Sequence, residues 1–101
     1  MKYINLTPHA ITLNNGTTFE PSGKVARVST RFTAISDDLL CHVEYGEVEN
    51  LPAPEEGTMY IVSAMVKAAT KRTDVVAPAT GHPLCVRNEK GQIVSVPCFV
   101  Q

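Results

Sequence analysis

The sequence of 101 residues has no long apolar run. No stretch approaches the roughly 18 consecutive apolar residues that a membrane-spanning helix needs. The first nine residues, MKYINLTPH, also lack the apolar core of a secretory signal. These two absences argue against a membrane or exported protein and predict a cytoplasmic one.

Cysteine is scarce, and none of it lies in a C-x-x-C motif. Cys41, Cys85 and Cys98 cannot all pair within one chain, which favours free thiols in a reducing compartment. Because all three lie among apolar β-type residues, we expect them to be reduced packing residues. His82 and Cys85 have the spacing of a zinc-ligand pair, but Cys41 and His42 are adjacent and point to opposite faces of a strand. We expect no metal and no cofactor.

A recognisable catalytic signature is also missing. Ser63 follows an apolar strand-like run, as the nucleophile of a hydrolase does, yet the segment Ile61–Met65 lacks the glycines that relieve such a turn. Ser63 is therefore expected to cap a helix. A small hydrolase is the least favoured of the three functions that we consider.

The composition is that of one globular domain, with 44% hydrophobic and 19% charged residues. The formal net charge of −1 argues against a general nucleic-acid binder, which is normally basic. The charge is unevenly placed, at +3 over residues 1–36, −7 over 37–56 and +3 over 57–101. One interpretation is a solvated surface of mixed charge. The other is that the two basic segments meet around an anionic ligand.

The segment Thr58–Pro78 is the centre of the predicted fold. It opens with the apolar run Met59–Val62, which lacks alternation and so predicts an interior strand with neighbours on both sides. Ser63 then begins a helix over about residues 63–70. Val75–Ala77 resumes a strand, which Pro78 ends.

Three hairpins are predicted around this segment. The strand pairs are 10–13 with 17–20, 24–36 with 39–45, and 84–87 with 92–100. Asn15-Gly16 favours a type I′ turn in the first hairpin, because both residues tolerate positive φ angles. Pro97 places the last strand at a sheet edge or a bulge. The expected fold class is mainly β (α+β), a small antiparallel barrel or two-layer sheet with one short helix.

Alternation in the second hairpin predicts one packed face and one solvated face. The residues expected to point inward are Ala26, Val28, Phe32, Ala34, Leu39, Cys41, Val43 and Tyr45. Arg27 and Arg31 fall on the outward face, about 13 Å apart at roughly 3.3 Å per residue. Gly46 permits a bulge or bend in the return strand.

Positive charge and hydrogen-bond donors without a catalytic base favour an anion site. Ser63 and the free N–H groups at the helix start could bind a phosphate or carboxylate. Arg27 or Arg31, together with Arg72 beside Asp74, could hold more of the ligand, so we expect Arg27 and Arg72 to converge. The alternative is that Arg72 and Asp74 form an ion pair within their turn. In that case Arg27 and Arg31 are solvated or pair with the acidic hairpin.

Four short motifs, taken together, carry a resemblance to a known protein family. They are Asn5-Leu6-Thr7-Pro8-His9, Ala26-Arg27-Val28, Tyr60-Ile61-Val62-Ser63 and Arg72-Thr73-Asp74-Val75. With them the chain resembles a family of small phage and prophage proteins of about this length, for which no activity is defined. The resemblance implies a setting in a bacterial cytoplasm. It also implies a function by analogy, because small phage proteins without enzyme motifs often inhibit host defence, in some cases by sequestering a nucleotide-derived signal.

Two functions of different class therefore stay open. The first is a non-enzymatic phage or prophage protein that binds a small anionic, nucleotide-like ligand and so sequesters a host immune signal. The alternative is a protein-interaction module or virion-associated accessory protein that acts through surface contacts. Neither involves a nucleic-acid polymer or a membrane, and an exposed edge strand offers a route to homo-oligomers.

Overall fold

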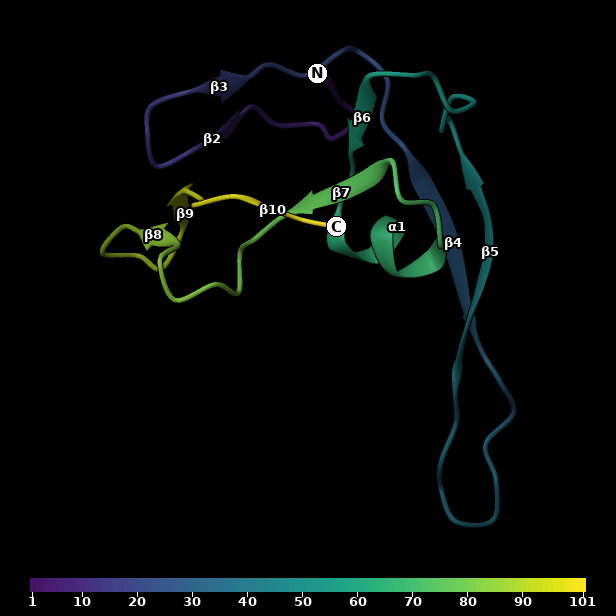
Figure 1. Cartoon of the computed structure of the whole chain (residues 1–101). Coiled ribbons are helices and arrows are strands. Elements are labelled where there is room, and N and C mark those ends of the chain that lie inside the picture. The colour runs from purple at the N-terminus through teal and green to yellow at the C-terminus, as the bar shows by residue number, and fades with distance from the viewer.

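The computed structural model describes all residues from 1 to 101 and is mainly β, with one short helix (Figure 1). The strands are β1 (Lys2–Asn5), β2 (Ile11–Thr12), β3 (Thr18–Phe19), β4 (Arg27–Phe32), β5 (Val43–Glu49), β6 (Thr58–Ile61), β7 (Val75–Pro78), β8 (Val86–Arg87), β9 (Ile93–Ser95) and β10 (Phe99–Val100). The helix is α1 (Ala64–Ala69). The predicted fold class is confirmed. The strands form one four-stranded sheet and three separate pairs, and no closed barrel is formed.

The central sheet has the strand order β1-β6-β7-β10. β6 runs parallel to β1 and to β7, whereas β10 pairs antiparallel with β7. The parallel step from β6 to β7 follows from the chain itself, because α1 lies between the two strands as a crossover helix. β6 has neighbours on both sides, as predicted, and Ile61 at its end is completely buried.

The helix begins as its sequence predicts. Ser63 is the N-cap residue in an extended conformation, and its Oγ accepts a hydrogen bond of 3.3 Å from the Val66 N–H. Thr70 ends the helix in an extended conformation, with its N–H donated to the Lys67 carbonyl. Val66 is the buried residue of α1, so this one side chain ties the helix to the sheet.

The main core lies between the central sheet, α1 and the segment before β4. Its members are the buried residues Leu6, Ala26, Tyr60, Val62, Val66 and Val75. A smaller aromatic cluster joins Tyr3 of β1, Phe19 of β3 and Phe99 of β10, with ring centroids 5.4–5.6 Å apart. These three rings hold the β2–β3 hairpin and β10 to β1, through edge-to-face and stacked contacts.

The motif Asn5-Leu6-Thr7-Pro8-His9 is explained by packing and hydrogen bonding. Asn5 is buried, and its amide group donates to the carbonyls of His9 at 2.8 Å and Phe19 at 2.9 Å. Its Oδ1 accepts a hydrogen bond of 2.9 Å from the Thr7 N–H. Leu6 fills the core. The motif therefore fixes the turn after β1 and needs no ligand to account for it.

The first hairpin turns where predicted, but with a different turn. Gly16 has a φ of +92°, whereas Asn15 is not among the residues with positive φ, so the turn is not type I′. The Gly16 N–H bonds the Leu13 carbonyl, and the Leu13 N–H bonds the Thr17 carbonyl. This three-residue loop needs the left-handed conformation only at its last position, where glycine stands.

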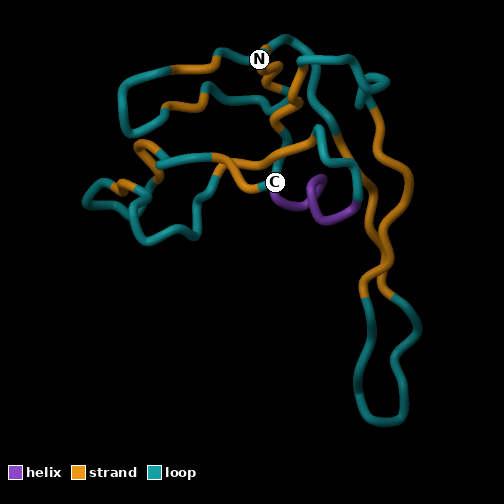
Figure 2. Tube along the Cα trace, viewed as in Figure 1, coloured by secondary structure: helices purple, strands orange, loops and turns teal.

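The second hairpin forms an arm that projects from the body of the molecule, and we call residues 27–49 the arm and residues 33–42 its tip (Figures 1 and 2). β4 and β5 pair antiparallel from Arg27–Glu49 to Phe32–Val43. The register shifts between Val28 and Thr30, opposite the predicted bulge at Gly46. A Cβ atom at position 46 would overlap the Ser29 hydroxyl, which would have to rotate away to admit it.

The predicted inward face of this arm is wrong beyond its base. Val28 and Val48 pack against the core, but every residue from 34 to 47 is exposed. Among the residues expected inside, Phe32 is 73% and Leu39 is 84% exposed. The alternation is present, but the rest of the chain supplies no second layer to cover it (Figure 2).

The cysteines also differ from expectation. All three are free thiols, but Cys41 on the arm tip and Cys98 are exposed, and Cys85 is only half-buried. They are therefore not core packing residues, because all three lie in loops beside the strands and outside the core. No helix of the structure is long and apolar enough to span a membrane.

Candidate functional site

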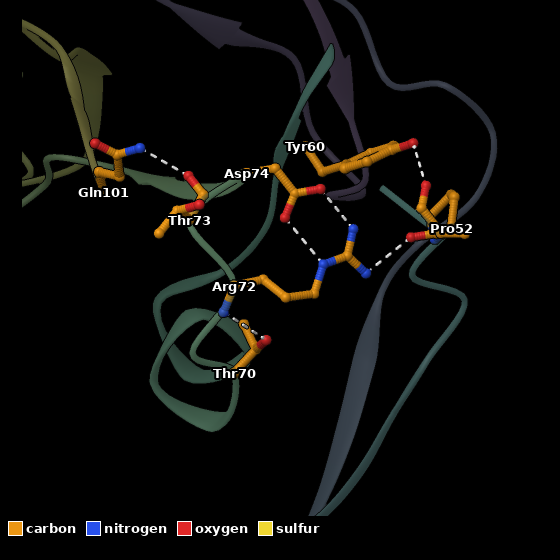
Figure 3. A network of polar contacts seen from close by, with 8 residues as sticks. Pro52, Tyr60, Thr70, Arg72, Thr73, Asp74 and Gln101 are labelled. Carbon is orange, nitrogen blue, oxygen red and sulfur yellow. Dashed lines mark hydrogen bonds and ion pairs between the residues drawn. The ribbon is translucent and has the colours of Figure 1, made fainter. Parts of the chain in front are cut away.

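Arg72 has the most extensive polar contacts of any predicted site residue (Figure 3). Its Nε donates to Asp74 Oδ1 at 2.9 Å, and its Nη2 donates to Asp74 Oδ2 at 2.6 Å. Its Nη1 donates to the Pro52 carbonyl at 2.9 Å. The guanidinium also lies 5.7 Å from the centroid of the Tyr60 ring. One side chain thus joins the turn before β7 to the loop before β6.

The electrostatics of this cluster follow from the same contacts. The hydrogen bonds from Arg72 lower the pKa of Asp74 below its ordinary value, against the smaller opposing effect of burial. The bond to Asp74 likewise raises the pKa of Arg72, so both groups stay charged. Burial raises the pKa of Tyr60, whose hydroxyl donates to the Ala53 carbonyl at 3.1 Å. All three side-chain nitrogens of Arg72 already have hydrogen-bond acceptors. This is the pattern of an ion pair with a structural role.

Arg31 is also paired, but at the surface. Its Nε lies 2.6 Å from Glu44 Oε2, across the β4–β5 ladder, and its side chain is 81% exposed. An exposed pair of this kind contributes about 0–1 kcal/mol. Arg31 therefore belongs to the arm and orients Glu44 across the strand pair.

Arg27 and Ser63 are the two predicted site residues that the structure brings together. Both line a shallow cleft of about 510 Å³ between α1, the start of β4 and the turn after β1. Glu49 lines the same cleft and stands opposite Arg27 in the strand pair, so a carboxylate accompanies the cation. Arg31, Arg72 and Asp74 do not line it. Arg72 is kept away because Asp74 and Pro52 hold its guanidinium.

The arm is the feature that sequence reasoning missed. Six large apolar side chains are exposed along it, namely Phe32, Ile35, Leu39, Leu40, Val43 and Tyr45. The tip is nonetheless ordered by its own hydrogen bonds, from Ser36 N–H to the Leu40 carbonyl at 2.8 Å and from Leu39 N–H to the Ser36 carbonyl at 2.9 Å. The signal that could have revealed it is the acidic segment itself, because five carboxylates on residues 37–49 are hard to place against a core.

No group of three or more His, Cys, Asp or Glu residues is placed to hold a metal ion. No protein-family model, no curated protein and no solved structure matches the chain. Function is therefore inferred from the residues and their geometry.

Proposed function

We propose that this chain is a non-enzymatic interaction protein whose arm is the surface that contacts a protein partner. The observation that carries this proposal is the exposure of every residue from 34 to 47, including five of the six large apolar side chains named above. Large clustered apolar surface on a small domain is typical of protein–protein contact sites.

The form of the arm supports this function. A two-stranded ribbon beyond the core cannot bury both of its faces, so its apolar side chains keep much of their contact with water when the single chain folds. They can lose it on association, and each fully buried side chain of this size then contributes roughly 1.5–3 kcal/mol. Tyr45 and Phe32 add aromatic groups, which are enriched at the centres of interfaces.

The resemblance to phage and prophage proteins supports a bacterial cytoplasm as the setting and a virion-associated or accessory role for the contact. The edge strand β10 offers another contact, but it is only two residues long. A ladder of that length gives few main-chain hydrogen bonds to a partner. The arm, at up to seven residues per strand, is the stronger surface.

The test is site-specific photo-crosslinking in the bacterial host. A benzophenone amino acid is placed at position 35 or 40 of the full chain, with position 15 in the β2–β3 turn as the exposed control. We expect one discrete protein adduct from the arm positions and none from position 15. Adducts that are absent from the arm, or equally abundant at position 15, would remove the arm as an interaction surface.

A second function has one observation in its favour, which is that Arg27 and Ser63 share a cleft. We propose it as the binding of a small anionic, nucleotide-like ligand, through which a host immune signal would be sequestered. Arg27 would supply charge-assisted hydrogen bonds, worth roughly 1.5–3 kcal/mol for one group. The Glu49 carboxylate in the same cleft would repel an anion, so we rank this function second.

Calorimetric titration of nucleotide-derived second messengers into the full chain tests the second function. Arg27→Ala should weaken binding by about one to two decades, and Arg27→Lys should recover part of the loss. Arg72→Ala, if folded, should bind as the wild type does because Arg72 lies outside the cleft. Equal affinity of the wild type and Arg27→Ala would exclude this cleft as the site.

A further inference from the structure

We propose that the partner of the arm is a second copy of this chain, with the tip of one copy packed on the β8–β9 hairpin of the other. This inference rests on the proposed function, because it names the occupant of the same surface. It is carried by three observations: the geometry of the tip, the distribution of charge, and the exposed apolar side chains on and beside β8–β9.

The tip holds an apolar residue in an unfavourable conformation. Leu39 has a φ of +63° and is 84% exposed. The left-handed region is natural for glycine and tolerated by asparagine, whereas a leucine there is strained. The Leu39 side chain gains no core contact in return. Strain kept at an exposed apolar residue indicates that its side chain is used outside the single chain.

The charge distribution favours a second copy as the partner. Residues 33–49 carry five carboxylates and neither Lys nor Arg, for a formal charge of −5. All nine Lys and Arg residues lie elsewhere, which leaves the rest of the chain at +4. Two arms placed side by side would bring Asp37 and Asp38 of both copies together, which is repulsive. An arm placed on the body of another copy brings opposite charges together.

The β8–β9 hairpin has the matching surface. Its exposed apolar residues are Leu84, Val86, Ile93 and Val94. Arg87 and Lys90 lie in the same segment with one carboxylate, Glu89, which gives residues 84–95 a formal charge of +1. The Arg87 guanidinium is held by the carbonyls of Thr80 at 3.0 Å and Gly91 at 3.1 Å. A fixed cation beside apolar side chains suits a tip that presents Leu39 and Leu40 next to Asp37 and Asp38.

The two surfaces lie on opposite sides of one chain. Figure 1 places the β8–β9 hairpin across the central sheet from the arm, so contact between them requires another copy. A two-fold arrangement uses the contact twice and leaves no unpaired surface. It thereby doubles the buried area towards the roughly 1,600 Å² of a standard stable interface.

The test is the molar mass of the full chain in solution, measured by sedimentation equilibrium over a range of concentrations. We expect twice the 10.9 kDa of one chain, with association weakened by salt. Asp37→Lys/Asp38→Lys should weaken the dimer by about tenfold or more, and Arg87→Glu/Lys90→Glu should do the same. The four changes combined in one chain should restore it, because the charges again attract.

The outcomes separate this inference from the proposed function. A wild-type chain that stays monomeric, or an Asp37→Lys/Asp38→Lys variant that associates as strongly as the wild type, overturns the second-copy contact. If the photo-crosslinker at position 35 or 40 then captures a different protein, the interaction function stands with another partner. If it captures nothing, both proposals fall.

Discussion

Arg72 and Asp74 form an ion pair through two hydrogen bonds, Nε to Oδ1 at 2.9 Å and Nη2 to Oδ2 at 2.6 Å. The side chains are 27% and 19% exposed, so water screens the pair less than it screens the surface pair of Arg31 and Glu44. The third bond, to Pro52, makes the pair a link between two loops. This relationship leads to the first two predictions.

Arg72→Ala should lower the free energy of unfolding by about 1.5–3 kcal/mol, because it leaves Asp74 and the Pro52 carbonyl without their donor. Arg72→Lys should recover only part of this, since an ammonium group cannot make the two parallel bonds. Urea titration measures both. Arg31→Ala is the matched control and should cost less than about 1 kcal/mol. Equal losses at the two arginines would contradict the structural role of Arg72.

The Asp74 pair also predicts a pH dependence. Because Arg72 lowers the pKa of Asp74 in the folded chain, this carboxylate stabilises the fold above its unfolded pKa of about 3.9. The stabilisation is lost as pH falls through the lower folded pKa. The difference in unfolding free energy between wild type and Asp74→Asn should therefore be constant above about pH 5 and shrink below about pH 4. A difference that does not change with pH would exclude this linkage.

Ile61→Ala should cost about 2–5 kcal/mol, as other truncations of buried isoleucine and leucine do. Ile61 is 0% exposed, in the strand between β1 and β7. Met65→Ala provides the control, since Met65 is 54% exposed and its loss should stay below about 1 kcal/mol. If the two variants have the same denaturant midpoint, β6 is not the centre of the core.

Asn5→Ala should lower the free energy of unfolding by about 1–3 kcal/mol, because the buried carbonyls of His9 and Phe19 lose their donor. Asn5→Asp should be worse at neutral pH, since it sets a carboxylate against two carbonyl oxygens. Asn15→Ala is the control, as the Asn15 side chain bonds only the exposed Thr17 N–H. Thermal unfolding measures the effect, and equal melting temperatures of the Asn5→Ala and Asn15→Ala variants would contradict this role of Asn5.

Leu39→Gly should stabilise the single chain by about 0.5–1 kcal/mol while weakening its association. Glycine relieves the positive φ angle, with part of the gain offset by a more flexible unfolded chain. Leu40→Gly removes a similar side chain without positive φ and should not stabilise. Unfolding measured at a protein concentration too low for association separates the effect on the single chain from the effect on association. Destabilisation by Leu39→Gly would mean that Leu39 packs within its own chain.

The sequence predicted those elements whose physics is local. Ser63 caps α1 because its hydroxyl and the following apolar residues suffice to begin a helix, and Pro78 ends β7 as expected. The non-alternating run at Met59–Val62 correctly indicated a strand with two neighbours. The ion pair of Arg72 and Asp74 was visible as an alternative, because the two residues share one short turn.

The sequence could not predict whether a face of a strand pair is covered by another part of the chain. Alternation along 24–36 and 39–45 showed two faces, but whether one is buried depends on a layer from elsewhere in the chain, which is absent for Phe32 and Leu39. The convergence of Arg27 and Arg72 failed for a related reason. Their separation depends on the carbonyl of Pro52, which no local pattern links to Arg72.

The strand order β1-β6-β7-β10 has a consequence for folding kinetics. The β4–β5 hairpin closes through a local turn, a step that takes about 1–10 μs in isolated hairpins. Pairing of β1 with β6 closes a long loop that contains the arm. The contact between Tyr3 and Phe99 joins residues near the two ends of the chain. Such non-local pairings slow folding. We therefore expect closure of the central sheet to limit the folding rate, and substitutions at the tip to leave the refolding rate unchanged.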